Sequence, residues 1–190
     1  MVARVSVTQV ILWVVGAPGA GKTTACRGLM GEVNYIVPTP KWTVAGSGTI
    51  AAAGHYIGAA FDGADTVPYN GAEAALKFWR STLAEQVRVT LLDGDRFSNS
   101  STRNWFKENA AWSLQLCVLI APSEATCAKQ RAQRGTSQNP IWVKGRTTKA
   151  LRFWEAFDPS CRLELSEADP PDVAKSIVRW IESKVNGFNL

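Results

Sequence analysis

Nine consecutive residues near the start of the chain have the types and spacing of a loop that binds phosphate. They match the pattern GxxxxGK[ST] in full and read Gly16, Ala17, Pro18, Gly19, Ala20, Gly21, Lys22, Thr23 and Thr24. Glycines let such a loop curl with its amide groups pointing inward, and the helix that follows adds partial positive charge. We expect the loop to bind ATP, with Lys22 reaching the β- and γ-phosphates and the Thr23 hydroxyl binding Mg²⁺.

A single carboxylate follows the second apolar run of the chain. Residues 87–92 are mostly apolar and lead directly into Asp93. Because open α/β sheets bind ligands at the carboxyl ends of their strands, Asp93 is expected to hold Mg²⁺ directly or through water. Many parallel strands end in Asp only because Asp is favoured in the turn that follows. The nearby phosphate loop is therefore the reason to expect that Asp93 binds a metal.

Other motifs narrow the class of phosphate-loop protein. The glycines of the loop are spaced GxxGxG, which argues against the GxGxxG fingerprint of a dinucleotide-binding enzyme. The guanine-reading NKxD, the DxxG switch and the transporter signature LSGGQ do not occur in the sequence. The chain leaves little room for the extra helical subdomain of many ring ATPases. The remaining branch is a kinase that transfers a phosphoryl group to an acceptor.

Positive charge is concentrated in one segment. The formal net charge is +5, yet residues 125–154 contain seven Lys or Arg and no Asp or Glu. Within this segment, Arg131 and Arg134 occur near the end of a predicted helix, and we expect a lid over residues 131–147 whose arginines stabilise the transferring phosphoryl group. The alternatives are a solvated helix face and arginines favoured by the negative end of the helix dipole.

The segment after the second strand offers a candidate base. It reads Leu92-Asp-Gly-Asp-Arg96 and is similar to a segment of nucleoside-monophosphate-type kinases. Its second carboxylate, Asp95, is placed to take the proton from an acceptor hydroxyl.

Three blocks together resemble a narrower family. They are Gly54-His-Tyr56 with Phe61-Asp-Gly-Ala-Asp65-Thr, the Asp-Gly-Asp-Arg segment, and Arg131-Ala-Gln-Arg134-Gly continuing through Asn139 and Trp142-Val-Lys144-Gly-Arg146-Thr-Thr-Lys149-Ala. The blocks resemble bacteriophage P-loop kinases that phosphorylate 5-hydroxymethyluracil within DNA. This resemblance extends from about residue 10 to residue 155.

The resemblance implies an acceptor and residues that bind it. The acceptor would be a primary hydroxyl on a modified pyrimidine in DNA. The Lys and Arg side chains of the basic segment would bind backbone phosphates of the DNA, and such contacts carry little information about base sequence. Trp142 or Trp105 would stack on a base. The alternative for each tryptophan is packing in the core. The alternative for His55 is an ordinary structural hydrogen bond rather than a contact with the acceptor. Asp65 is a second candidate for the base, equal in rank to Asp95. The full set of implied acceptor-binding residues is His55, Asp62, Asp65, Arg96, Trp142, Lys144 and Arg146.

Apolar runs alternate with amphipathic segments, and this predicts the elements that position these residues. Strands are expected at 10–15, 87–92, 114–121 and 162–165, and helices at 23–30, 72–86, 101–109, 123–134, 147–157 and from 169 onward. Alternation of this kind predicts an α/β fold, a three-layer P-loop NTPase with a mostly parallel sheet covered by helices on both faces. Three further stretches, 34–37, 42–45 and 49–53, have strand-like composition; whether they extend the main sheet or form a side hairpin is open.

The composition limits the class of protein to which the chain can belong. The chain has 190 residues, 46% of them hydrophobic and 19% charged, which fits a single globular domain over residues 1–190. No apolar run is long enough to cross a bilayer and no secretory signal is recognised, so a cytoplasmic location and no membrane partner are expected. The four cysteines, Cys26, Cys117, Cys127 and Cys161, are far apart and only one His is present, which argues against a zinc site or a disulfide framework.

The sequence therefore predicts an ATP- and Mg²⁺-dependent phosphotransferase. Its expected acceptor is the 5-hydroxymethyl group of 5-hydroxymethyluracil in phage DNA. The alternatives are a soluble nucleoside monophosphate kinase, whose partner is a free nucleotide, and a DNA-stimulated ATPase or nucleotide-dependent DNA-binding protein. Oligomeric state does not follow from the sequence.

Overall fold

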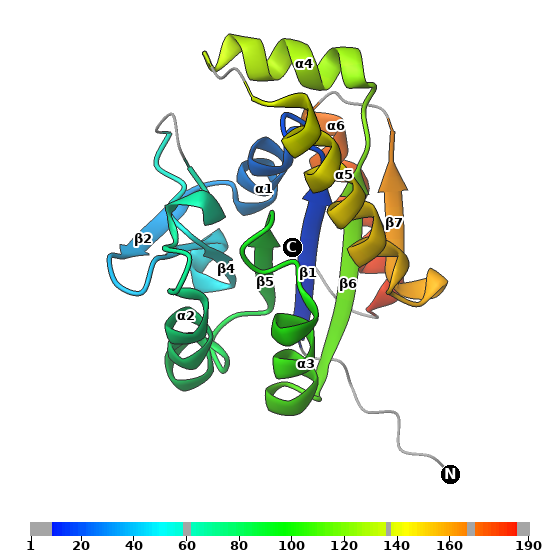
Figure 1. The fold of residues 1–190 in the computed structure, drawn as a ribbon. Coiled ribbons are helices and arrows are strands. Elements are labelled where there is room, and N and C mark those ends of the chain that lie inside the picture. The colour runs from blue at the N-terminus through cyan, green and yellow to red at the C-terminus, as the bar shows by residue number, and fades with distance from the viewer. Residues whose placement is uncertain (1–8, 59–61, 136–137, 167–169, 186–190) are drawn as a thin grey trace.

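A seven-stranded sheet forms the centre of the protein (Figure 1). The computed structural model describes residues 9–58, 62–135, 138–166 and 170–185. The strands are β1 (Gln9–Gly16), β2 (Val33–Val37), β3 (Trp42–Ala45), β4 (Ile50–Ala53), β5 (Val89–Asp93), β6 (Ser113–Ile120) and β7 (Arg162–Leu165). The helices are α1 (Lys22–Met30), α2 (Ala72–Phe78), α3 (Ser100–Asn109), α4 (Glu124–Gln133), α5 (Pro140–Glu155) and α6 (Pro170–Lys184).

The strand order is β2-β3-β4-β5-β1-β6-β7, and most of the sheet is parallel. Strands β4, β5, β1, β6 and β7 pair in parallel, whereas β2 and β3 add an antiparallel extension next to β4. The strand-like stretches whose place the sequence left open therefore belong to the main sheet. Strand β1 lies in the middle, and all eight of its residues are buried because helices cover both of its faces.

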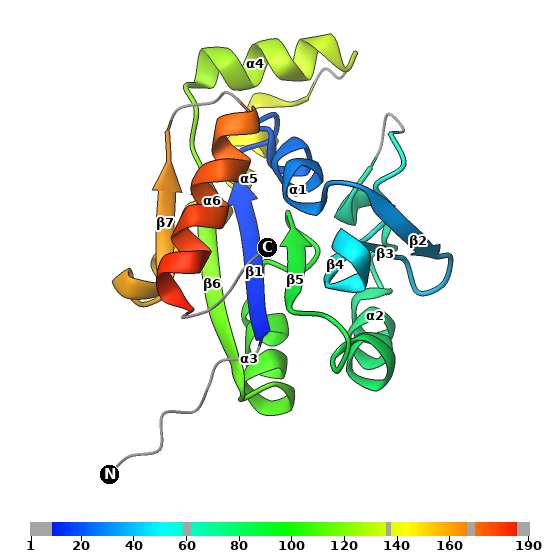
Figure 2. The same ribbon diagram turned by 180° about the vertical axis from the view of Figure 1, so that it is seen from behind.

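Each face of the sheet packs against its own set of helices. Strand residues alternate between the two faces, so Leu12 contacts one hydrophobic cluster and Trp13 the other. Helices α1 and α6 cover the Leu12 face, and Figure 2 shows them in front of β1. Helices α2, α3 and α5 cover the Trp13 face. The prediction of three layers with a mostly parallel sheet is confirmed.

Helix α5 begins earlier than the sequence analysis predicted. The expected helix covered residues 147–157, after a loop through Pro140, but the structure begins the helix at Pro140 itself. The Asn139 side chain accepts a hydrogen bond from the amide of Ile141, and proline suits the first helical turn because its missing N–H has no intrahelical partner there. Lys144 and Arg146 are therefore helical residues of α5, and the predicted start of this helix at residue 147 is wrong.

Two other predicted elements differ in detail. The expected helix 72–86 is α2 followed by a π-helical turn over Trp79–Leu83. Helix α6 buries Val173, Ile177 and Ile181, and Val185 directly after it is also buried, while Asp169, the expected start of the helix, lies outside the described residues. Within the described part of the chain, none of the helices combines the length and the apolar character that a membrane span needs.

Candidate active site

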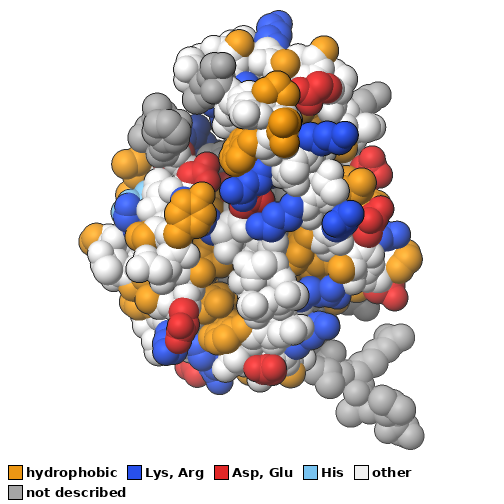
Figure 3. Space-filling model, in the orientation of Figure 1, with side chains coloured by type: hydrophobic (Ala, Val, Ile, Leu, Met, Phe, Trp, Pro, Cys, Tyr) orange, Lys and Arg blue, Asp and Glu red, His pale blue; other side chains and the backbone are white. Residues whose placement is uncertain are grey.

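A cavity of about 500 Å³ opens at the carboxyl ends of β1 and β5. It brings together predicted residues that are far apart in the sequence: Gly16, Pro18, Gly19, Gly21, Lys22, Thr23, Thr24, Asp62, Asp65, Asp93, Asp95, Arg96, Arg131, Arg134, Trp142 and Arg146. In the space-filling view of this face, acidic side chains lie partly covered by Lys and Arg around a hollow (Figure 3). These predicted residues therefore line one cavity of mixed charge, and anion binding there stays a prediction.

The glycines of residues 16–24 fit the backbone path of a phosphate loop. Gly16, Gly19 and Gly21 have φ values of +154°, +83° and +89°. A Cβ atom on Gly16 would lie 2.3 Å from the Ile120 carbonyl oxygen, and one on Gly19 would lie 2.5 Å from the Cys127 carbonyl oxygen. At Gly16 and Gly19 the loop therefore has room for backbone alone, and only glycine fits there without a shift.

Lys22 and Thr23 begin α1 and point their polar atoms into the same region. The Lys22 Nζ donates hydrogen bonds to the carbonyl oxygens of Gly16, at 3.2 Å, and Ala17, at 2.9 Å. The Thr23 hydroxyl donates a hydrogen bond of 2.7 Å to Asp93 Oδ2. Loop and strand β5 are thus joined at the two groups predicted to hold Mg²⁺.

Asp93 is held in a buried position. Its residue surface is 3% exposed, and the Tyr56 hydroxyl lies 3.5 Å from the same carboxylate oxygen. Burial raises the pKa of the Asp93 carboxyl above its usual range, and the Asp65 charge adds to that rise. The nearby Lys22 ammonium and the Thr23 hydrogen bond lower the same pKa. A bound cation would favour the charged form of this carboxylate.

The donor set suits Mg²⁺ bound together with a nucleotide. Thr23 and Asp93 supply one hydroxyl and one carboxylate, which are the hard oxygen donors that Mg²⁺ prefers. Among the described residues, no three His, Cys, Asp or Glu side chains form a metal-binding cluster. Mg²⁺ ordinarily takes its other ligands from phosphates and water, so the pair fits that ion.

The two candidate bases differ in their surroundings. Asp95 forms an ion pair with Arg146, and the Lys149 Nζ lies 4.0 Å from its Oδ1. Asp65 is exposed within the cavity, and none of the described residues forms a hydrogen bond or an ion pair with its carboxylate. The oxygens of Asp65 are open to a ligand, whereas those of Asp95 already face cations.

The arginines of α4 lie over the phosphate loop. The Arg131 guanidinium donates a hydrogen bond of 2.8 Å to the Pro18 carbonyl oxygen, and it pairs with Glu124 at 2.5 Å. Arg134, at the end of α4, is exposed and lines the cavity. The ribbon shows α4 across the end of the sheet at which β1 terminates (Figure 1). Both arginines therefore have access to the place where phosphates are expected.

Helix α5 contributes side chains from two of its faces. Trp142 lines the cavity and is 43% exposed, and the Arg146 guanidinium lies 5.1 Å from the centre of its ring. Lys144 is exposed and lines a separate shallow groove together with Arg152, on the outside of the helix. The structure therefore does not bring Lys144 to the cavity.

Two other predicted contacts, His55 and Trp105, are not among the residues that line the cavity. His55 Nε2 lies 3.0 Å from the Val37 carbonyl oxygen, and His55 is not among the residues that line the cavity. Trp105, on α3, is partly buried and packs against Trp79 and Phe106, and it does not line the cavity, so its contacts fit the core-packing alternative. Phe61, part of one resembling block, lies outside the described residues.

Asp62 has a structural role in addition to lining the cavity. It is 8% exposed, forms an ion pair with Arg27 and accepts hydrogen bonds from the amides of Ile57, at 3.0 Å, and Gly58, at 3.1 Å. These contacts fix the segment after β4 against α1. Its oxygens are largely taken, and substrate binding by Asp62 stays a prediction.

The sequence analysis did not assign roles to several residues of the site. Tyr69 lines the cavity, is 82% exposed, and has the Arg96 guanidinium 3.6 Å from the centre of its ring. Arg27 could have been found from its helical spacing, four residues after Thr23. Tyr56 and Tyr69 reach the site only through the path of residues 54–69, for which the sequence carries no comparable signal.

The protein has a mixed α/β fold with a mostly parallel sheet flanked by helices, and this fold is similar to that of a known kinase. One similar structure is a sugar kinase from Janibacter sp. HTCC2649, with a TM-score of 0.52 and 11% identity over 92% of this chain and 95% of that one. Another is a shikimate kinase from Acinetobacter baumannii in complex with shikimate, with a TM-score of 0.43 and 14% identity over 94% of this chain and 96% of that one. No protein-family model and no curated protein matches the sequence.

Proposed function

We propose that the protein is a kinase that transfers the γ-phosphoryl group of ATP to a hydroxyl group. The observation that carries this proposal is the cavity that joins the glycine loop, Lys22, the Thr23–Asp93 pair and the arginines of α4. Kinases transfer a phosphoryl group mainly by positioning and charge stabilisation, and the cavity supplies groups for both. The fold shared with a sugar kinase supports the same class.

Each group has a separate task. The loop amides and Lys22 bind the β- and γ-phosphates, and Arg131 and Arg134 stabilise the charge that spreads over the transferred group. Thr23 and Asp93 would hold Mg²⁺, which would supply charge neutralisation at the phosphate oxygens. The acceptor oxygen bonds to the γ-phosphorus as the bond to the bridging oxygen breaks, and ADP leaves.

We assign to Asp65 the role of the base that takes the proton of the acceptor hydroxyl. A base needs a free oxygen within reach of that hydroxyl, and the exposed carboxylate of Asp65 in the cavity has no ion-pair or hydrogen-bond partner among the residues that the structure describes. Asp95, which pairs with Arg146, positions helix α5 instead. The two carboxylates thereby take different roles.

The specific acceptor that we propose is the 5-hydroxymethyl group of 5-hydroxymethyluracil in DNA. The resemblance of the three sequence blocks supports it, as do Trp142 in the cavity and the cations along α5. A soluble nucleoside monophosphate kinase is the alternative, in which the same cations bind only free nucleotides.

An acceptor assay with γ-labelled ATP tests these possibilities. The protein is incubated with a duplex containing 5-hydroxymethyluracil, with unmodified duplex and with free deoxynucleoside monophosphates. We expect label on the hydroxymethylated duplex alone. Label on the monophosphates alone would reject DNA as the acceptor, and label found solely as inorganic phosphate would reject the kinase assignment.

A further inference from the structure

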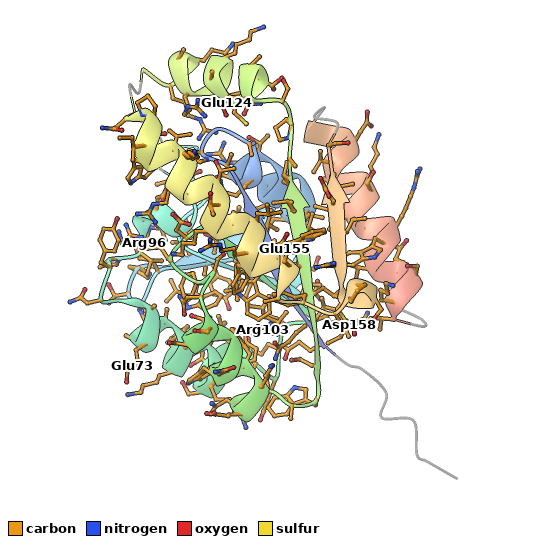
Figure 4. All side chains as sticks on the ribbon, turned by 45° about the vertical axis from the view of Figure 1, so that its right-hand side comes forward. Glu73, Arg96, Arg103, Glu124, Glu155 and Asp158 are labelled. Carbon is orange, nitrogen blue, oxygen red and sulfur yellow. The ribbon has the colours of Figure 1, made fainter. Side chains whose placement is uncertain are left out.

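The cavity has a wall that the proposed reaction does not use. It consists of Tyr69, which follows the Asp65 segment, and Arg96, which follows β5. The Arg96 guanidinium lies 3.6 Å from the centre of the Tyr69 ring, which is a cation–π contact. Figure 4 shows Arg96 beside the N-terminal half of α5, whereas Glu155 and Asp158 lie at the other end of that helix.

Arg96 carries charge that the described part of the protein does not neutralise. Its guanidinium forms no hydrogen bond or ion pair with any described residue, and its Nη1 atom is buried without a hydrogen-bond partner. Arginines in such half-buried places ordinarily pair with carboxylate or phosphate, because an unsatisfied charged donor is costly. Two of the acids that line the cavity already have a cationic partner: Asp62 pairs with Arg27 and Asp95 with Arg146. An anion from a ligand would complete the arrangement.

Tyr69 offers an aromatic surface beside that charge. Its side chain belongs to a residue that is 82% exposed, although large aromatic side chains gain by burial. The guanidinium of Arg96 lies over one face of its ring, and Tyr69 lines the cavity, where its exposed side chain is open to a ligand. A planar ring stacked there would extend the Arg96–Tyr69 stack by one layer, as bases stack on tyrosine in nucleic-acid-binding proteins.

We propose that Tyr69 and Arg96 form the acceptor subsite and that it takes a nucleotide unit. The Tyr69 ring stacks on the base, and the Arg96 guanidinium binds the phosphate of the same unit. This inference rests on the proposed kinase function and narrows it: the acceptor has a planar base and a phosphate, so a free nucleoside or a sugar binds poorly. The phosphate can belong to a free nucleotide or to a DNA strand.

Binding measurements test the subsite without relying on turnover. Isothermal titration in the presence of ADP and Mg²⁺ compares 5-hydroxymethyl-2′-deoxyuridine with its 5′-monophosphate. We expect the wild-type protein to bind the monophosphate at least tenfold more tightly than the nucleoside. In Arg96→Gln that preference disappears; in Tyr69→Ala both ligands bind about tenfold more weakly, and Tyr69→Phe keeps the wild-type affinities.

Matched variants control for general effects of the substitutions. Arg80→Gln removes an arginine that lies 4.9 Å from the ring centre of Trp112, outside the cavity. Tyr35→Ala removes a tyrosine that is 47% exposed on β2. Both are expected to bind as the wild type does.

The outcomes separate this inference from the proposed function. If Arg96→Gln keeps the preference for the monophosphate, if Tyr69→Ala binds normally, or if the wild type binds neither ligand, the subsite is wrong, whatever the transfer assay gives. If the binding pattern appears as expected but no hydroxyl receives label from ATP, the kinase function fails and the nucleotide subsite remains. A third titration with a hydroxymethyluracil-containing oligonucleotide shows whether the phosphate belongs to DNA: tighter binding than the monophosphate supports a DNA source, and weaker binding a free nucleotide.

Discussion

At the scale of single residues, the two carboxylates that sequence alone ranked equally are separated by their contacts. Asp95 is engaged by Arg146 and approached by Lys149, while Asp65 has no such partner among the described residues. A paired carboxylate can organise the site, but an open one can accept a proton.

This difference predicts unequal effects of matched substitutions. Asp65→Asn should lower kcat for phosphoryl transfer by about 10²- to 10⁴-fold, the usual contribution of a general base. Asp95→Asn should lower it by about tenfold or less, since it loosens α5 without removing the base. Steady-state kinetics with saturating ATP measure both. Equal losses, or a larger loss in Asp95→Asn, would reverse the assignment.

The buried carboxylate of Asp93 predicts an effect on stability. Burial raises the pKa of the Asp93 carboxyl in the folded protein, so the protonated carboxyl does not lower the free energy of unfolding. The charged carboxylate does lower it. This loss of stability begins as pH rises above the ordinary Asp pKa, near 4, and is complete above the folded-state pKa. Without nucleotide or Mg²⁺, Asp93→Asn should therefore melt a few degrees above the wild type at pH 7, since ~1 kcal/mol shifts a domain of this size by about 2–4 °C.

Thermal melts of both proteins between pH 3.5 and 8 check this expectation. The stability difference should shrink toward the acidic end, where the wild-type carboxyl is protonated. A variant that melts below the wild type at pH 7 would mean that the charged carboxylate stabilises the fold.

At the scale of elements, the loop between β1 and α1 depends on close backbone packing. Gly16→Ala would place a Cβ 2.3 Å from the Ile120 carbonyl oxygen, at a φ of +154°, so the loop must shift. We expect ATP binding to be lost and the free energy of unfolding to fall by roughly 1–3 kcal/mol.

Gly145→Ala is the matched control. Gly145 lies within α5, and nothing lies within 4 Å of a Cβ placed there. This substitution should raise the free energy of unfolding by about 0.5–1 kcal/mol through helix propensity. Chemical denaturation measures both variants, and the account of the loop would be contradicted by a Gly16→Ala protein as stable and as tightly ATP-binding as Gly145→Ala.

Local signals in the sequence predicted part of this arrangement. The glycine loop and Asp93 were identified because their function needs a fixed short spacing next to a buried strand. The start of α5 was missed because the residues before it have loop-like composition, although Asn139-Pro140 is itself a helix-start signal. The positions of Tyr56 and Tyr69 depend on the pairing of His55 with Gly63, a tertiary contact without a local pattern.

At the scale of the whole molecule, the basic segment divides between two surfaces. Arg131, Arg134 and Arg146 line the cavity, whereas Lys144 and Arg152 lie in the groove on the outside of α5. The inner group suits the phosphates of a bound nucleotide. The outer group is placed to meet a longer polyanion.

This division predicts a salt-dependent contribution to DNA binding. The double variant Lys144→Gln/Arg152→Gln should bind hydroxymethylated duplex more weakly and reduce the slope of log K against log[salt] by about 2. Its affinity for Mg²⁺-ATP should match the wild type, because neither residue lines the cavity. Fluorescence anisotropy across a salt series measures the slope, with Lys77→Gln/Lys175→Gln as a control that removes two exposed lysines elsewhere. An unchanged slope would place the DNA on another surface.

The central claim is that residues 16–24 bind the triphosphate of ATP together with Mg²⁺. Isothermal titration of Mg²⁺-ATP into the wild type and into Lys22→Ala tests it most directly. The account predicts one ATP per chain for the wild type and binding at least about tenfold weaker for a folded Lys22→Ala, which has lost the phosphate-binding ammonium. No binding to the wild type, or equal affinity in both proteins, would contradict it.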